Sequence, residues 1–373
     1  MKILQVLTIF MLFKKHVEAN HIVEIPEGYD RYEKPSGIVK VNASMNLRNI
    51  IKLSEKEQII SLKTTLRMFW RDERLNIMIN SDFPGTRRDP DHNNLTYLVH
   101  TLDQIDRVWM PDLFVDEAIS VRKPAYKIPT ESLRFYEDGS LRFSHRFNFD
   151  VGCTMDFSHY PVDVQDCIIK LESFSFTEKD LVFTWLGREA MRVNPDIQVP
   201  HYDFKMITDT KYKTGYYSEN YAGLEIRLHL VRKMYVHILQ DFLPSFLYVW
   251  IAYFAIQMPP EIPQVRAGLV MFPMLTLTTL SNRVRSEIPA ASVLTIMDVW
   301  LLGCLIFIFS CMVVIVISAV LVRNDKEHLS KAFEFWFKII YPIIFTGLSI
   351  IYAVILINKH MSQLAERGYS DHF

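Results

Sequence analysis

The sequence lacks both an excess of one charge and the motifs of the common enzyme classes. Its formal net charge is −1 over 373 residues, and this balance argues against a nucleic-acid-binding protein, which needs a basic excess. It contains no glycine-rich phosphate loop, no zinc-ligand spacing among its twelve histidines and no nucleophile elbow. We therefore expect a protein that is not an enzyme, with no catalytic residue, no metal, no cofactor and no nucleic-acid partner.

Cysteine is also scarce, with four in the whole chain. Cys304 and Cys311 lie inside an apolar run and are expected to be reduced packing residues. Cys153 and Cys167 are therefore the natural disulfide pair, which requires an oxidising compartment. In the entropic model, closing so short a loop stabilises the fold by about 3 kcal/mol.

The first residues predict export of the chain. Lys2 precedes an apolar run over residues 3–13 that is too short to cross a bilayer, so residues 1–19 are expected to be a cleavable signal peptide. The alternative is a disordered tail. Asn42 and Asn94 each begin a triplet with the form of a glycosylation acceptor. These features together favour an extracellular location for residues 20–233.

Residues 20–233 have the pattern of a β-protein. Apolar and polar side chains alternate over residues 141–151 and again over 224–230, which is typical of half-buried strands. Short turn sequences separate such runs. We therefore expect an antiparallel all-β sandwich, with one short helix around residues 46–52.

Long apolar segments appear after residue 233 and predict a four-helix transmembrane bundle over residues 234–358. Each segment is long enough for a hydrocarbon core of about 30 Å. The linker between the last two segments is rich in lysine and arginine, which favours the cytoplasmic side, and an even number of spans then returns the C-terminal tail to the outside. The expected spans are 235–258, 266–284, 293–322 and 341–358, the linker is 323–340 with a short amphipathic helix over 325–340, and the tail is 359–373.

The second apolar segment differs in character from the others. One helical stripe along it changes from small through apolar to hydroxyl and amide side chains, which suits a water-filled lumen better than lipid. Because one helix cannot enclose a pore, this interpretation requires several copies of the chain. The alternative is a bundle helix whose threonines bond to its own carbonyls. The stripe consists of Gly268, Phe272, Leu275, Thr279 and Asn282.

The stretch between the paired cysteines resembles a known signature. Residues 153–167 read C-x-M-x-F-x-x-Y-P-x-D-x-Q-x-C, which is similar to the loop of the Cys-loop receptors, the eukaryotic pentameric ligand-gated ion channels. The stretches WMPDLF at 109–114, LESF at 171–174 and DVW at 298–300 also resemble that family. The likeness is greatest to the branch of glycine-, GABA- and glutamate-gated anion channels. It implies a homopentamer, or a hetero-oligomer with related subunits, in the plasma membrane.

The resemblance implies that the 153–167 loop couples the sandwich to the membrane helices. In the family this loop lies at the base of the sandwich, and the Tyr160–Pro161 bond is a candidate for the cis form. Asp163 is expected to pair with Arg232, just before the first span. The alternative is an ordinary surface ion pair, worth at most about 1 kcal/mol.

The resemblance also implies an agonist site between neighbouring subunits. Aromatic faces on one subunit would attract an ammonium group, and Glu172 would pair with it. Arg67 and Ser144 on the other subunit would hold a carboxylate, which a guanidinium grips by two hydrogen bonds. The expected agonist is a small zwitterion such as an amino acid, or an amine. Alternatively, each aromatic is a packing residue and Arg67 a solvated charge. The aromatic set is Phe114, Phe174, Phe176 and Tyr221.

Charge along the second segment predicts the permeant ion. Arg266 at the inner end and Arg283 and Arg285 at the outer end would form positive rings that favour chloride. Val265 stands at the inner end, where cation channels of the family carry an acidic ring.

The same segment carries an expected gate. Phe272 and Leu275 would form two stacked apolar constrictions. Pro273 should kink the helix, and the alternative is that this kink turns Phe272 away from the lumen. Two other functions remain open: a cation-permeable or orphan channel with another ligand, and a non-conducting membrane-anchored binding or adhesion protein.

Overall fold

The computed structural model describes most of the chain. The expected signal peptide over 1–19 and the last residues of the expected tail, 367–373, lie outside the described residues. The described ranges are 23–79, 85–90, 94–100, 105–124, 130–187, 190–209, 213–216, 219–260, 262–289 and 294–366.

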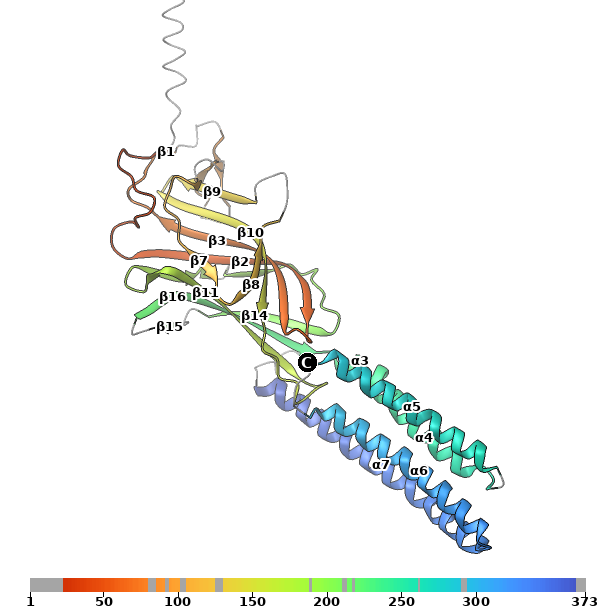
Figure 1. The fold of residues 1–373 in the computed structure, drawn as a ribbon. Coiled ribbons are helices and arrows are strands. Elements are labelled where there is room, and N and C mark those ends of the chain that lie inside the picture. Colours follow the sequence, from red (N-terminus) through yellow and green to blue (C-terminus); the bar gives the residue numbers. More distant parts are fainter. Residues whose placement is uncertain are drawn as a thin grey trace, which may run out of the picture.

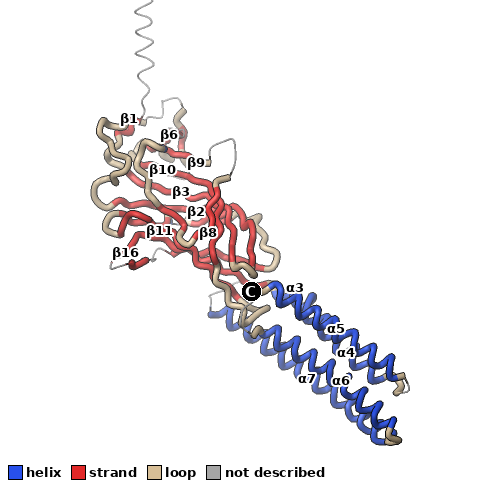
Figure 2. The backbone as a smooth tube through the Cα atoms, in the orientation of Figure 1, coloured by secondary structure: helices blue, strands red, loops and turns tan. Residues whose placement is uncertain are grey.

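Two β-sheets pack face to face and form the first domain (Figures 1 and 2). The larger sheet has the order β12-β2-β3-β10-β9-β6-β5, with β13 on β2 and β8 on β10, and the smaller has the order β14-β16-β11-β7, with β15 on β16. A further pair joins β1 and β4. Most pairs are antiparallel as predicted, but β12 and β13 run parallel to β2.

The strand bounds are as follows. The larger sheet contains β2 (Val39–Ser54), β3 (Ile59–Arg71), β5 (Arg87–Arg88), β6 (Thr96–His100), β8 (Ala118–Arg122), β9 (Glu131–Tyr136), β10 (Ser140–Gly152), β12 (Leu181–Trp185) and β13 (Met191–Val193). The smaller sheet contains β7 (Leu113–Val115), β11 (Val164–Thr177), β14 (Tyr202–Asp209), β15 (Lys213–Tyr216) and β16 (Glu219–Arg232), and the separate pair is β1 (Val23–Glu24) and β4 (Asn76–Ile77).

Side-chain alternation forms the core of the sandwich. Leu141, Phe149 and Val151 of β10 are buried between the sheets, as the alternating pattern predicts. The helix expected around residues 46–52 is wrong, because β2 continues through this segment. Leu47 is fully buried and pairs with Thr64 of β3, so cross-strand burial overrides the local pattern.

The second domain is an elongated set of helices below the sandwich (Figure 1). It consists of α3 (Met234–His237), the π-helical turn η2 (Ile238–Phe242), α4 (Leu243–Gln257), α5 (Pro263–Glu287), α6 (Ile296–Arg323) and α7 (Glu327–Glu366). Within the described residues, three helical segments are long and apolar enough to cross a membrane: Met234–Gln257, Ile296–Arg323 and Glu327–Ala365. The segment α5 is not among them, since threonine, asparagine and arginine occur along it.

The last helix differs from the sequence prediction. Residues 327–340, expected as part of a separate linker, are the first turns of α7, which runs without a break to Glu366. At its far end Leu364 packs against Val164 and Val231 at the base of the sandwich. The helix therefore extends along the whole second domain and contacts the first.

Candidate functional site

An exposed pair of aromatic rings lies on the smaller sheet. Phe114 of β7 pairs in register with Glu172 of β11, and the Phe114 and Phe174 rings meet edge to face with centroids 6.1 Å apart. Phe174 is 79% exposed and Phe114 38% exposed. Large apolar rings exposed in this way are typical of a binding surface.

Asp112 fixes the backbone beside these rings. Its two carboxylate oxygens accept hydrogen bonds from the Ser173 hydroxyl at 2.6 Å and from the Ser175 amide at 2.7 Å. The Ser173 hydroxyl in turn accepts from the Phe176 amide at 2.9 Å. Asp112 belongs to the WMPDLF stretch but was not among the predicted site residues.

The other members of the predicted aromatic set lie further inside. Phe176 packs edge to face on Trp109 at 6.0 Å, and Trp109 packs on Trp70 at 6.5 Å, so this row of rings extends into the core. Tyr221 of β16 lies opposite Thr177 of β11. Glu172 is 8% exposed.

Arg67 and Ser144 lie on the other sheet. They are directly opposite each other on β3 and β10 and are half-buried. Within one subunit the strands therefore separate them from Phe114 and Phe174, which belong to the smaller sheet.

Arg232, the last residue of β16, occupies a buried cluster at the base of the sandwich. It donates to Asp163 through Nε at 2.7 Å and to Glu55 through two nitrogens at 2.9 Å each. The guanidinium lies between the rings of Tyr160 and Tyr202, 4.7 and 4.6 Å from their centroids. The expected pair with Asp163 is thus present, and Glu55 is a second partner that the sequence analysis missed.

The electrostatics of this cluster favour the charged guanidinium. Burial alone would lower the pKa of Arg232, but the adjacent Asp163 carboxylate raises that pKa well above its usual range. Burial raises the pKa of Tyr160 as well, so its hydroxyl stays protonated. The cluster therefore holds one permanent cation between carboxylates and neutral rings.

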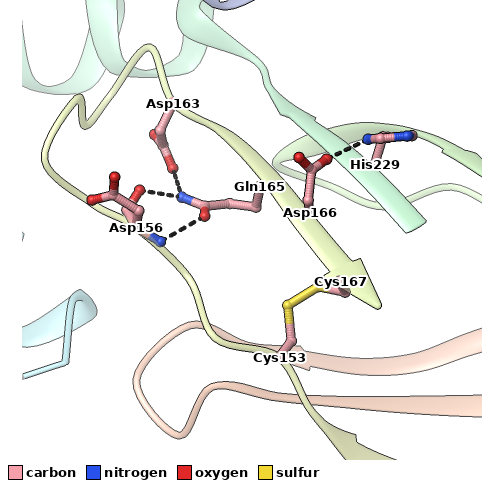
Figure 3. Close-up of a disulfide and its surroundings, with 7 residues drawn as sticks. All are labelled: Cys153, Asp156, Asp163, Gln165, Asp166, Cys167 and His229. Carbon is pink, nitrogen blue, oxygen red and sulfur yellow. Dashed lines mark hydrogen bonds and ion pairs between the residues drawn. A yellow bond between two sulfur atoms is a disulfide. The ribbon is translucent and has the colours of Figure 1, made fainter. Parts of the chain in front are cut away.

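The loop that the disulfide closes is tied to the same cluster (Figure 3). Cys153 and Cys167 are joined, and the Tyr160–Pro161 bond is cis. The buried Gln165 amide donates to the Asp163 carboxylate and to the Asp156 carbonyl at 2.7 Å, and it accepts from the Asp156 amide at 2.8 Å. Gln165 thereby links Asp156, near the start of the loop, to Asp163, which bonds Arg232.

The loop contacts the helices directly. The Tyr160 carbonyl accepts from the Met297 amide at the start of α6, at 3.2 Å, and the Tyr160 hydroxyl lies 3.4 Å from Nδ1 of His237. His237 contacts Asp241 of η2 at 2.9 Å, and Asp241 pairs with Arg283 of α5. A continuous polar path therefore joins the sandwich to α5, through two residues that the sequence analysis missed, His237 and Asp241.

One face of α5 is packed against the other helices and the opposite face is open. The packed face consists of Arg266, Val270, Pro273, Leu277 and Val284. All five residues of the predicted stripe are exposed, with Phe272 at 64% and Leu275 at 60%, and so is Val265 at 50%. Pro273 is buried, whereas the exposed Phe272 side chain takes little part in the packing of the helices of this chain.

Arg266 contradicts the prediction of an exposed positive ring. Its side chain is 2% exposed and donates to Glu334 of α7 at 2.9 Å and to the carbonyls of Ala255 and Ile256 at 3.3 and 3.4 Å. Arg266 was predicted to form a positive ring because it lies at the inner end of the second apolar segment, but a buried carboxylate on another helix binds it.

The two outer arginines are more accessible. Arg283 bonds to Asp241 with its side chain 48% exposed, and Arg285 contacts Asp298 at 3.2 Å with its side chain 63% exposed. Asp298 also caps α6 by bonding Thr295.

A comparison with protein families complements this geometry. Residues 18–234 match the model of the neurotransmitter-gated ion-channel ligand binding domain. The match covers more than half of the chain and includes both sheets, the disulfide loop and Arg232.

Proposed function

We propose, from the premise that the chain belongs to the neurotransmitter-gated ion-channel family, that it forms a pentameric, agonist-gated chloride channel. The coarser statement, a ligand-gated channel subunit in a membrane, follows from the family itself. The open face of α5 is the observation that supports the proposal of a pentameric channel most directly. Five copies of this face around an axis would enclose a lumen, and the subunits are either identical or related.

The agonist is a small zwitterion or amine bound between neighbouring subunits. Phe114 and Phe174 offer exposed π faces to an ammonium group. Arg67 and Ser144 lie side by side on the opposite sheet, where they suit a carboxylate from across the interface.

Chloride selectivity depends on the outer end of α5. With Arg266 buried against Glu334, Arg285 and Arg283 remain as accessible positive charges. Five copies would concentrate anions at the entrance. The same topology puts both chain ends outside, which the contact of Leu364 with the sandwich base supports. The exposed Asn42 and Asn94 would carry glycans there.

Recording of current in oocytes that express the chain tests this function. A panel of amino acids and amines is applied, and reversal potentials are measured while chloride or sodium is replaced. A reversal potential that follows chloride supports the proposal. One that follows sodium favours a cation-permeable channel, and a protein that reaches the surface and binds an agonist without current favours a non-conducting receptor.

Phe174→Ala is expected to raise the agonist concentration for half-maximal current about tenfold. A cation–π contact of this kind is worth about 0.5–2 kcal/mol, and 1.4 kcal/mol corresponds to a factor of ten. Ile168→Ala is the control, because Ile168 is also exposed, at 44%, and lies on the same strand β11 but is not among the proposed agonist contacts. Equal shifts for both variants would argue against Phe174 as a ligand contact.

Phe272→Ser is expected to increase the current without agonist. A hydroxyl in place of an exposed apolar ring hydrates the narrow part of the lumen, which an apolar constriction otherwise keeps dry. The measurement is the holding current that a pore blocker removes. Met271→Ser is the control, since Met271 is exposed beside Phe272 but lies off the stripe. An unchanged holding current in Phe272→Ser would refute the gate.

A further inference from the structure

We propose that each subunit contains a second small-molecule site, between the two sheets and behind Phe114. Its ligand class is a small aromatic molecule with one hydroxyl or N–H donor. This site lies inside one chain, so it is distinct from the agonist site between chains and does not depend on the identity of the agonist.

The first observation is a cavity of about 500 Å³ in the sandwich. Ligand cavities for small molecules are about 300–1,000 Å³ and are mostly apolar with a few polar groups. Side chains from both sheets line this one, among them Leu66, Met68, Phe143, Phe147, Leu113 and Leu171. A flat apolar ring suits such walls.

The second observation is a histidine on the core face of β10. His145 continues the alternation of Leu141, Phe143, Phe147 and Phe149, so it points between the sheets and not to the outside. Its ring meets Phe143 and Phe147 edge to face at 6.0 and 5.0 Å. A polar ring thus stands among aromatic walls of the cavity.

The hydrogen bonds of His145 indicate which kind of ligand group would bind to it. Nδ1 lies 3.0 Å from the Glu131 carboxylate, which Lys123 also contacts at 2.6 Å. Burial lowers the pKa of His145, so the ring is neutral at pH 7 and its one proton bonds to Glu131. Nε2 is then an acceptor, and it is buried without a partner in the described part of the chain. Buried polar atoms of this kind are usually satisfied, and a ligand hydroxyl or N–H would satisfy this one.

The cavity has an edge at the surface. Arg31 and Tyr32 line it and are exposed. Arg31 donates to the Asp106 carbonyl, and its guanidinium lies 4.9 Å from the Tyr32 ring. A ligand that enters at this edge would displace these two surface side chains.

Phe114 connects the cavity to the proposed agonist site. This residue lines the cavity and also forms the exposed aromatic pair with Phe174. A molecule in the cavity would contact Phe114 from the cavity side and restrict the position of its ring. The occupant should therefore change agonist potency without competing for the agonist site.

Binding of two probes to the purified channel tests the site. Wild-type protein is titrated with 4-iodophenol, which carries a donor, and with iodobenzene, which does not, and the iodine is located by anomalous diffraction. We expect 4-iodophenol in the cavity with at least tenfold higher affinity than iodobenzene. In His145→Phe, which keeps a ring but removes the acceptor, the two probes should bind equally.

Several results would overturn the proposal. They are ordered water alone at His145 with no iodine in the cavity, equal affinity of both probes for wild type, and unchanged preference in His145→Phe. If His145→Phe does not fold, Met68→Phe provides a second variant, because the larger side chain narrows the cavity and should weaken both probes. Since these readouts are binding and position, they stand even if the channel conducts no chloride.

Discussion

Arg232→Gln should abolish agonist-evoked current and destabilise the sandwich. Arg232 is buried and holds both Asp163 and Glu55. Removal of the cation leaves two carboxylates close together with no counter-charge, and breaking a buried pair in this way costs about 3–5 kcal/mol. The path from the sandwich to α5 also loses the residue that stacks on Tyr160.

The measurements separate folding from coupling. Thermal unfolding of the purified channel reports stability, and surface labelling combined with current reports function. Arg227→Gln is the matched control on the same strand, since the Arg227 side chain is 48% exposed although its partner Glu225 is mostly buried. Its loss should therefore destabilise the sandwich less than the loss of the buried Arg232. Normal current and unfolding temperature in Arg232→Gln would contradict the assigned role.

Arg232→Lys refines this prediction. Lysine keeps the charge but cannot reproduce the fork that bonds Glu55 through two nitrogens and Asp163 through Nε. Compared with Arg232→Gln, we expect Arg232→Lys to recover part of the stability and a smaller part of the agonist-evoked current.

The second large effect is expected for Arg266→Met. Glu334 of α7 is buried and its partner Arg266 is 2% exposed. The single substitution leaves this carboxylate with only the longer contact to Lys338, at 3.8 Å, and should cost about 3–5 kcal/mol. The double variant Arg266→Met with Glu334→Leu should recover most of this loss, because an apolar pair of similar volume needs no counter-charge.

A thermodynamic cycle over wild type, both single variants and the double variant measures the coupling between Arg266 and Glu334. Lys331→Met is the control, since the Lys331–Glu327 pair on the same helix is exposed at 69% and 65% and its loss should leave the stability nearly unchanged. A double variant as unstable as Arg266→Met would contradict the pairing.

Local patterns predicted a large part of this fold. The alternation over residues 141–151 corresponds to β10, and the apolar runs correspond to helices α4, α6 and α7. These predictions succeed because the periodic burial of side chains is visible in the sequence of a single helix or strand. Cysteine counting predicted the disulfide, and the resemblance added the contact of Asp163 with Arg232; both are present.

Partners that are distant in the chain explain the failures. Glu55 and Arg232 are 177 positions apart, and Arg266 and Glu334 are 68 apart. No local pattern connects such residues, so Arg266 was expected at a pore mouth instead of in a buried pair. His145 occupies a core position in an otherwise apolar alternation. A polar residue in such a pattern was the sequence feature from which a site at His145 could have been predicted.

We propose above that the open face of α5 lines a conduit. Thr279 is exposed on this face and Leu277 is buried on the opposite one, and the native Cys304 and Cys311 are buried. The direct test applies a charged, membrane-impermeant thiol reagent to agonist-opened channels that carry Thr279→Cys or Leu277→Cys. We expect loss of current in Thr279→Cys and no change in Leu277→Cys or wild type; loss in Leu277→Cys with none in Thr279→Cys would contradict a pore-lining role for this face.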